Sequence, residues 1–172
     1  MPGDEPQWGD GTFEFGRWET PFENADVELM EVVRGYGPLT RKDDEAAWER
    51  RSLLKSPCEA TLVVLVRIHQ TNGGQPDYFD DPLYRVSFQD ASAFRVLDEG
   101  GLSEFWYQTK KLGGRPGQTT FRVRNHEWFT ESLLPWIHGT EEGWSYVIAT
   151  SGDCIEVVAG EPPVITLEEL SD

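Results

Sequence analysis

The sequence predicts an α+β domain with a mostly antiparallel sheet of seven or eight short strands and about three short helices. Short alternating or β-branched segments recur along the chain, and turn-forming residues separate them. The candidate helices fall singly between strands, without the repeating strand–helix spacing of a doubly wound fold. With 172 residues, of which 38% are hydrophobic, the chain has the size of one domain with a core. We expect a flexible N-terminal segment, 1–11, and a single α+β domain, 12–172.

Eight segments have the composition of strands, and Val164–Ile165 could add an edge strand near the C-terminus. The segment 60–68 is nearly all β-branched or aliphatic, so we expect it to be the central strand, buried on both faces. Ser151–Asp153 lies between the last two long segments and predicts a hairpin. The eight segments are 12–15, 27–33, 60–68, 83–88, 93–97, 119–124, 143–150 and 154–158.

Three segments have the character of helices. Residues 41–54 follow Thr40, a candidate N-cap, and carry acids in the first turn and arginines near the end, which matches the helix dipole. Residues 101–107 predict a short helix with a large aromatic face. Residues 127–134 predict a third helix, which ends before Pro135.

The chain is strongly acidic, with 31 acidic and 15 basic residues and a net charge of −16. Such a field disfavours nucleic acids and anionic membranes and favours a basic protein as partner. Residues 126–172 contain no Lys or Arg, whereas the stretch between Glu104 and Glu127 contains five basic residues and no acid. This basic stretch either pairs with the acidic ends of the chain or belongs to a bipolar surface that leaves an acidic patch exposed.

The sequence contains none of the motifs that we associate with catalysis, metal binding or nucleotide binding. The three histidines lack the spacing of a zinc site, and no serine lies in a GxSxG elbow. Cys58 and Cys154 lie far apart and outside any CxxC pair, so we expect two buried free thiols. We therefore expect no catalytic residue, cofactor or metal. Because the N-terminal residues lack an apolar run, we expect a cytoplasmic protein.

The aromatic residues provide the candidate binding site. Consecutive aromatic side chains on a short helix cannot all point inward, so we expect one or two to be exposed, where Trp and Tyr favour protein–protein contacts. The candidate partner-binding residues are Phe105, Trp106, Trp128, Trp136, Glu141 and Glu142.

Two stretches, Phe88–Trp106 and Gly143–Val158, resemble patterns in small acidic uncharacterised bacterial proteins, some of them immunity proteins of polymorphic toxin systems. The resemblance implies a class of protein and no individual site. Our leading hypothesis is a non-enzymatic protein-binding domain, an immunity-like neutraliser of a basic toxin partner. The alternative is a small-molecule-binding domain or small enzyme with an unrecognised pocket. A third hypothesis is a homodimer formed through an exposed sheet edge.

Overall fold

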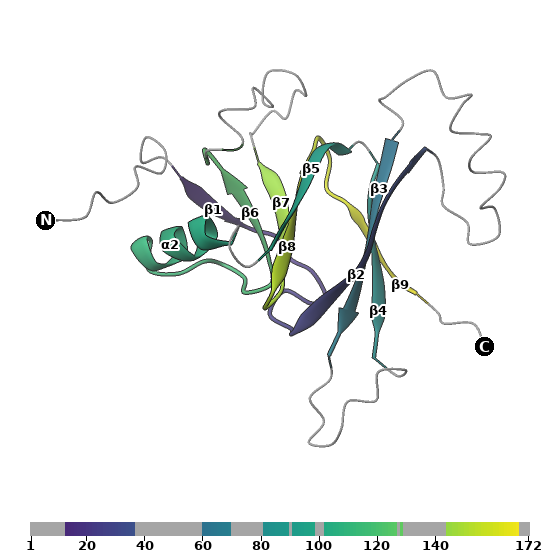
Figure 1. Cartoon of the computed structure of the whole chain (residues 1–172), viewed down its shortest axis with the longest axis horizontal. Coiled ribbons are helices and arrows are strands. Elements are labelled where there is room, and N and C mark those ends of the chain that lie inside the picture. The colour runs from purple at the N-terminus through teal and green to yellow at the C-terminus, as the bar shows by residue number, and fades with distance from the viewer. Residues whose placement is uncertain are drawn as a thin grey trace, which may run out of the picture.

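The computed structural model describes residues 13–36, 60–69, 81–89, 91–98, 102–126, 128 and 144–168. Within these ranges the chain forms two antiparallel sheets and one helix (Figure 1). The five-stranded sheet has the order β1-β6-β7-β8-β5, and the four-stranded sheet has the order β2-β3-β4-β9. The elements are β1 (Glu14–Arg17), β2 (Val27–Tyr36), β3 (Ala60–Ile68), β4 (Leu83–Phe88), β5 (Ala91–Asp98), α2 (Ser103–Lys111), β6 (Thr120–Arg124), β7 (Ser145–Ala149), β8 (Asp153–Ala159) and β9 (Val164–Glu168).

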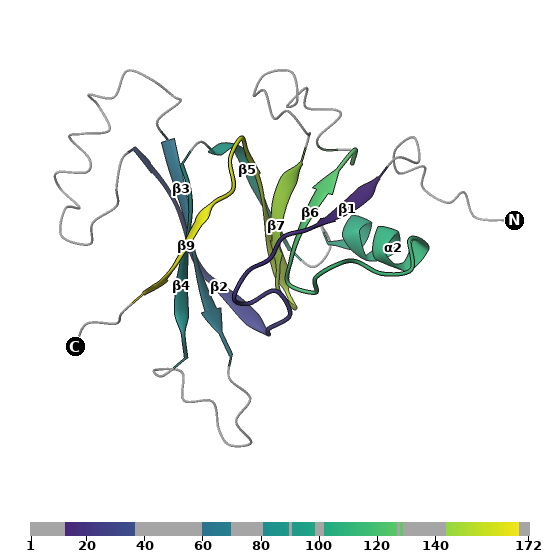
Figure 2. The ribbon, with the colours of Figure 1, turned by 180° about the vertical axis from the view of Figure 1, so that it is seen from behind.

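The described elements form three layers. The two sheets face each other, and α2 lies against the face of the five-stranded sheet that points away from the four-stranded sheet (Figures 1 and 2). The five-stranded sheet is therefore the middle layer, and its inner strands β7 and β8 are buried on both faces. No helix among the described residues is long and apolar enough to cross a membrane.

The predicted α+β class is wrong, because the described chain is nearly all sheet, with nine strands and a single helix. The strand segments themselves are confirmed, including an edge strand at β9. The helix predicted at 101–107 is confirmed as α2, whereas the one predicted at 41–54 lies outside the described residues, as do the segment 1–11 and all of 127–134 except Trp128. The sequence also predicted a single sheet where the structure has two. Alternation within a strand identifies its buried face, but it does not say whether the strands share one sheet or divide between two.

The predicted hairpin between β7 and β8 is confirmed, and local chemistry explains it. Ala149 pairs with Cys154 across the turn. The Thr150 hydroxyl oxygen accepts hydrogen bonds from the backbone N–H groups of Gly152, at 3.1 Å, and Asp153, at 3.0 Å. A threonine side chain that bonds to the backbone two and three residues ahead favours a tight reversal of the chain.

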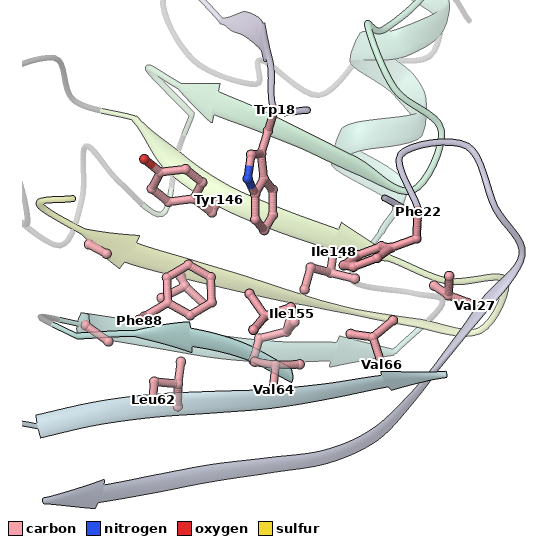
Figure 3. Packing of buried hydrophobic residues seen from close by; sticks show 14 residues of the cluster. Trp18, Phe22, Val27, Leu62, Val64, Val66, Phe88, Tyr146, Ile148 and Ile155 are labelled. Atoms are coloured by element: carbon pink, nitrogen blue, oxygen red, sulfur yellow. The ribbon is translucent and has the colours of Figure 1, made fainter. Parts of the chain in front are cut away.

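The core between the sheets comes from residues that alternate along facing strands (Figure 3). The Trp18 ring joins the two sheets, because its centroid lies 5.1 Å from that of Tyr146 on β7 and 6.3 Å from that of Phe88 on β4. Other buried side chains in this core are Phe22, Val27, Leu62, Val64, Val66, Val86, Ile148, Ile155 and Val157.

A second core lies between the five-stranded sheet and α2. Phe105 of α2 is fully buried, and its ring meets that of Phe121 on β6 edge to face, with centroids 5.8 Å apart. Leu102, Val123 and Val147 fill the rest of this layer. The helix carries an acid in its first turn and two lysines in its last, an arrangement that complements its dipole.

Replacing Phe88 with alanine should lower the free energy of unfolding by about 3–5 kcal/mol, because the fully buried ring leaves a cavity between the sheets. Leu167→Ala is the control, since Leu167 is 58% exposed and its truncation should cost less than about 1 kcal/mol. Urea denaturation of both variants measures the difference. Equal losses would contradict the placement of Phe88 between the two sheets.

Candidate functional site

The sequence-predicted binding residues differ in exposure, and three of them lie outside the described residues. Phe105 is fully buried and belongs to the core under α2, so it is not part of a surface. Trp106 is 39% exposed, and Trp128 is partly buried. The other three candidates, Trp136, Glu141 and Glu142, lie outside the described residues.

Both described tryptophans of this set stack against arginines. The Arg115 guanidinium carbon lies 4.1 Å from the Trp106 ring centroid, and that of Arg95 lies 4.6 Å from the Trp128 ring centroid. Such contacts place a cation on the negative face of the ring and hold both side chains in place. The prediction that one or two of these aromatic side chains are exposed is confirmed for Trp106 of the short helix.

The basic residues that follow Glu104 also differ in their contacts and exposure. Arg124 of β6 forms an ion pair with Glu14 of β1, at 2.5 Å, which is the pairing with an acidic end that the sequence suggested. Arg122 donates instead to the carbonyl oxygen of Arg17, at 3.1 Å. Lys110 and Lys111 are exposed at the end of α2. Pairing with an acidic end of the chain is therefore confirmed for Arg124, whereas the bipolar surface stays a prediction.

A buried charge cluster, which the sequence did not predict, lies on the α2 side of the five-stranded sheet. Its centre is Glu156 of β8, which is fully buried. Arg95 of β5 is directly opposite Glu156 in the strand register, and its Nη2 lies 2.7 Å from Glu156 Oε2. His126 Nε2 lies 2.5 Å from Glu156 Oε1, and the Ser145 hydroxyl of β7 donates to the same oxygen, also at 2.5 Å.

The partners of Glu156 lower its pKa by more than burial raises it. Burial by itself would raise the pKa of this carboxyl group, but the charge of His126 and its hydrogen bond, together with Arg95 and Ser145, lower that pKa below its ordinary value near 4.5. Glu156 is therefore a buried carboxylate, held between a cation from β5 and a histidine that follows β6. Trp128 covers Arg95, so this predicted binding residue also contributes to the cluster.

The order of groups in the cluster does not match that of a nucleophilic triad. In a triad the hydroxyl is bonded to the imidazole, which removes its proton, and the carboxylate orients the imidazole from the far side. Here the Ser145 hydroxyl and His126 both contact Glu156, so the carboxylate lies between them. The cluster thus joins β5, β7, β8 and the end of β6, and its role in the described structure is to connect these elements.

The described thiol is also enclosed. Cys154 is a free, fully buried cysteine, and burial together with the neighbouring Glu156 raises its pKa to about 12. This confirms the prediction of a buried free thiol at Cys154, while Cys58 lies outside the described residues. No group of three or more His, Cys, Asp and Glu residues in the described ranges is arranged to hold a metal ion.

Among the four edge strands of the described sheets, three have features that oppose the pairing of another strand. β1 is only four residues long. β2 carries a bulge between Leu29 and Glu31, and β5 carries one between Ala91 and Ala93. Short length, charge and bulges are the usual protections of a sheet edge.

β9 differs from these three strands. All five of its residues pair in regular register with β4. Its single charged residue, Glu168, is engaged in an ion pair with Arg85 of β4. Val164 is 54% exposed and Leu167 is 58% exposed. Within the described residues β9 is therefore a regular, largely apolar edge with no strand on its outer side.

Most of the negative charge belongs to parts of the sequence outside the described residues. The described residues contain 13 of the 31 acids and 10 of the 15 basic residues, a net of −3. The remaining segments of the sequence therefore carry a net charge of −13. Acids also flank β9 in the sequence, with Glu161 before it and Glu169 and Asp172 after it.

No family model, curated protein or solved structure matches the chain. The resemblance to immunity proteins therefore stays a prediction.

Replacing Glu156 with glutamine should lower the free energy of unfolding by about 3 kcal/mol at pH 7, because partly buried Arg95 loses its counter-charge and fully buried His126 loses its carboxylate partner. Glu168→Gln is the matched control. It removes the same charge from an ion pair whose side chains are both 28% exposed, and should cost less than about 1 kcal/mol. Chemical denaturation of the two variants measures both effects, and a similar small loss in both would contradict the cluster.

The same carboxyl group should make stability depend on pH. Because its pKa is lower in the folded chain than in the unfolded chain, Glu156 stabilises the fold fully above pH 4.5, and this contribution is lost as the pH falls through the folded pKa. The difference in unfolding free energy between the wild type and Glu156→Gln should therefore shrink as the pH is lowered from 7 to 3. A difference that stays constant over this range would show that Glu156 does not titrate as a stabilised carboxylate.

Proposed function

We propose that the chain is a non-enzymatic binding domain whose partner is a basic protein, as an immunity protein neutralises a basic toxin domain. The observation that carries the proposal is β9, a regular apolar edge strand without the protections found on the other described edges. An unprotected edge presents unpaired backbone N–H and C=O groups, which are a template for another strand. Recognition of an extended segment by strand addition is a common binding mode.

The charge distribution supports a basic partner. The described residues account for only −3 of the net charge of −16. Most of the negative charge therefore does not take part in the ion pairs of the described sheets. A field of this kind attracts a cationic protein over a distance of about one Debye length, near 8 Å at physiological salt, and speeds encounter. We infer that charge accelerates association and that strand addition supplies the short-range contact.

The chemistry of β9 specifies the segment that it would receive. Ile165 and Leu167 lie on the face of the sheet that carries the core, and Val164 lies on the opposite face. An incoming strand therefore needs apolar side chains at alternate positions to cover Leu167 and extend the core. Because acids flank β9 on both sides, Lys or Arg should flank the incoming strand.

A second copy of the chain is a less suitable occupant of this edge. Two copies would each bring a net charge of −16 and acids at the same flanking positions. Like charges at the contact oppose association, whereas a basic strand is attracted to it. We therefore expect a monomer in the absence of the partner, and light scattering at physiological salt measures this directly.

Replacing Leu167 with lysine should weaken partner binding by about tenfold or more, because the charge opposes a basic strand on β9 and removes its apolar contact. Val96→Lys is the matched control, since Val96 is 51% exposed on the edge strand β5 and gains the same charge. The tagged full chain first recovers a partner from its source cells at low salt. Titration calorimetry of that purified partner then compares the wild type with both variants.

Two results would overturn the proposal. Equal affinities for Leu167→Lys and Val96→Lys would exclude β9 as the docking edge. A recovered partner that is acidic, or whose binding does not weaken as salt rises, would exclude electrostatic recognition of a basic protein. If Leu167→Lys alone turns a dimer into a monomer, the occupant of β9 is a second copy instead.

A further inference from the structure

A polar cavity of about 300 Å³ opens where three connecting segments meet, at the ends of the strands. One wall is the segment that leads into β2, another is the loop between α2 and β6, and the third is the turn of the β7–β8 hairpin. The lining residues are Asn24, Ala25, Asp26, Val27, Arg115, Gln118, Thr119, Ala149, Thr150 and Ser151. A volume of this size is at the lower end of the range for small-molecule sites, roughly 300–1,000 Å³.

The walls of the cavity are joined by hydrogen bonds, so its shape belongs to the folded chain. The backbone N–H of Gln118 donates to the side-chain oxygen of Asn24, at 3.2 Å. The Thr119 hydroxyl donates to the carbonyl oxygen of Ala25, at 2.5 Å. These contacts join the first wall to the second, and the β-hairpin turn is closed by Thr150. Such a cavity needs little rearrangement to accept a ligand.

Arg115 is the cationic residue among those that line this cavity. Its guanidinium carbon lies 4.1 Å from the ring centroid of Trp106 and 4.8 Å from that of Phe121. Its Nε and Nη2 donate to the carbonyl oxygens of Gly117 and Gln118, at 3.0 and 2.5 Å. Its Nη1 is buried and has no hydrogen-bond acceptor among the described residues. Burial lowers the pKa of this side chain to about 10, and no carboxylate contributes to that shift.

A guanidinium in this position is costly unless an anion offsets its charge. Neutral carbonyl groups satisfy part of its hydrogen-bonding capacity, but they leave the positive charge uncompensated in a partly desolvated site. A carboxylate or another oxyanion matches the planar fork of the guanidinium and forms short, charge-assisted hydrogen bonds with it. The rings of Trp106 and Phe121 hold the side chain in place, so its geometry is set before a ligand arrives.

We propose that this cavity binds a small molecule through an oxyanion group, a carboxylate or a phosphate, held against Arg115. The remaining lining groups limit which molecules fit. Asn24, Gln118 and Ser151 offer neutral hydrogen-bonding side chains, and Asp26 adds a carboxylate. The ligand therefore carries hydrogen-bond donors or a cationic group toward Asp26, as a small zwitterion does. This site is separate from β9, and the proposal does not depend on the protein partner.

The test is a titration of the ¹⁵N-labelled full chain followed by NMR, at constant ionic strength maintained with sodium chloride. The probes are acetate, inorganic phosphate and glycine, which separate a carboxylate, a phosphate and a zwitterion. At least one probe should shift the amide signals of Gln118, Thr119 and Ser151 along one saturable curve. Arg115→Gln should weaken that binding by about tenfold or more, whereas Lys111→Gln, which removes an exposed charge from α2, should leave it unchanged.

A second variant keeps the test decisive if Arg115→Gln does not fold. Ser151→Glu adds a carboxylate to the lining at an exposed turn position and should also weaken anion binding by about tenfold or more with Arg115 intact. Shifts that grow linearly for every probe, or a saturable shift that survives both Arg115→Gln and Ser151→Glu, would overturn the proposal.

Discussion

Burial of β7 and β8 on both faces is the constraint on which the rest of the described structure depends. The four-stranded sheet covers one face of these strands and α2 covers the other. Successive side chains of β8 therefore enter two different cores, with Ile155 in the core between the sheets and Cys154 in the core under the helix. A sheet covered on both sides requires three layers. The β7–β8 hairpin therefore lies at the centre of the middle layer, between the four-stranded sheet and α2.

The same constraint explains the buried charge cluster. A carboxylate in the middle of a strand that is covered on both faces cannot reach water, so it must be compensated where it stands. Arg95 on the neighbouring strand, His126 after β6 and Ser145 on β7 provide that compensation for Glu156. The cluster thereby fixes the position of β5, and Trp128 covers it from outside.

Much of the local structure could be predicted from the sequence, but the arrangement of the strands in two sheets could not. Alternation and turn residues located the strands, and the run of aromatic residues located α2, because these signals are local. The division into two sheets depends on long-range packing, which no local pattern encodes. A signal for the charge cluster was present in the sequence: Arg95 and Glu156 are the charged residues in the interior of β5 and β8, each of which has an aspartate at one end. Their pairing required the register of β5 with β8.

The central functional claim is that β9 is an unprotected edge, whereas the other three edges of the described sheets are protected. Amide hydrogen exchange tests it most directly, with the chain alone and in complex with its partner. We predict that the amides in 164–168 that point away from β4 exchange quickly in the free chain and become protected in the complex, while those of β7 and β8 are protected in both. Protection of 164–168 that is already equal to that of β7, or that does not change in the complex, would contradict it.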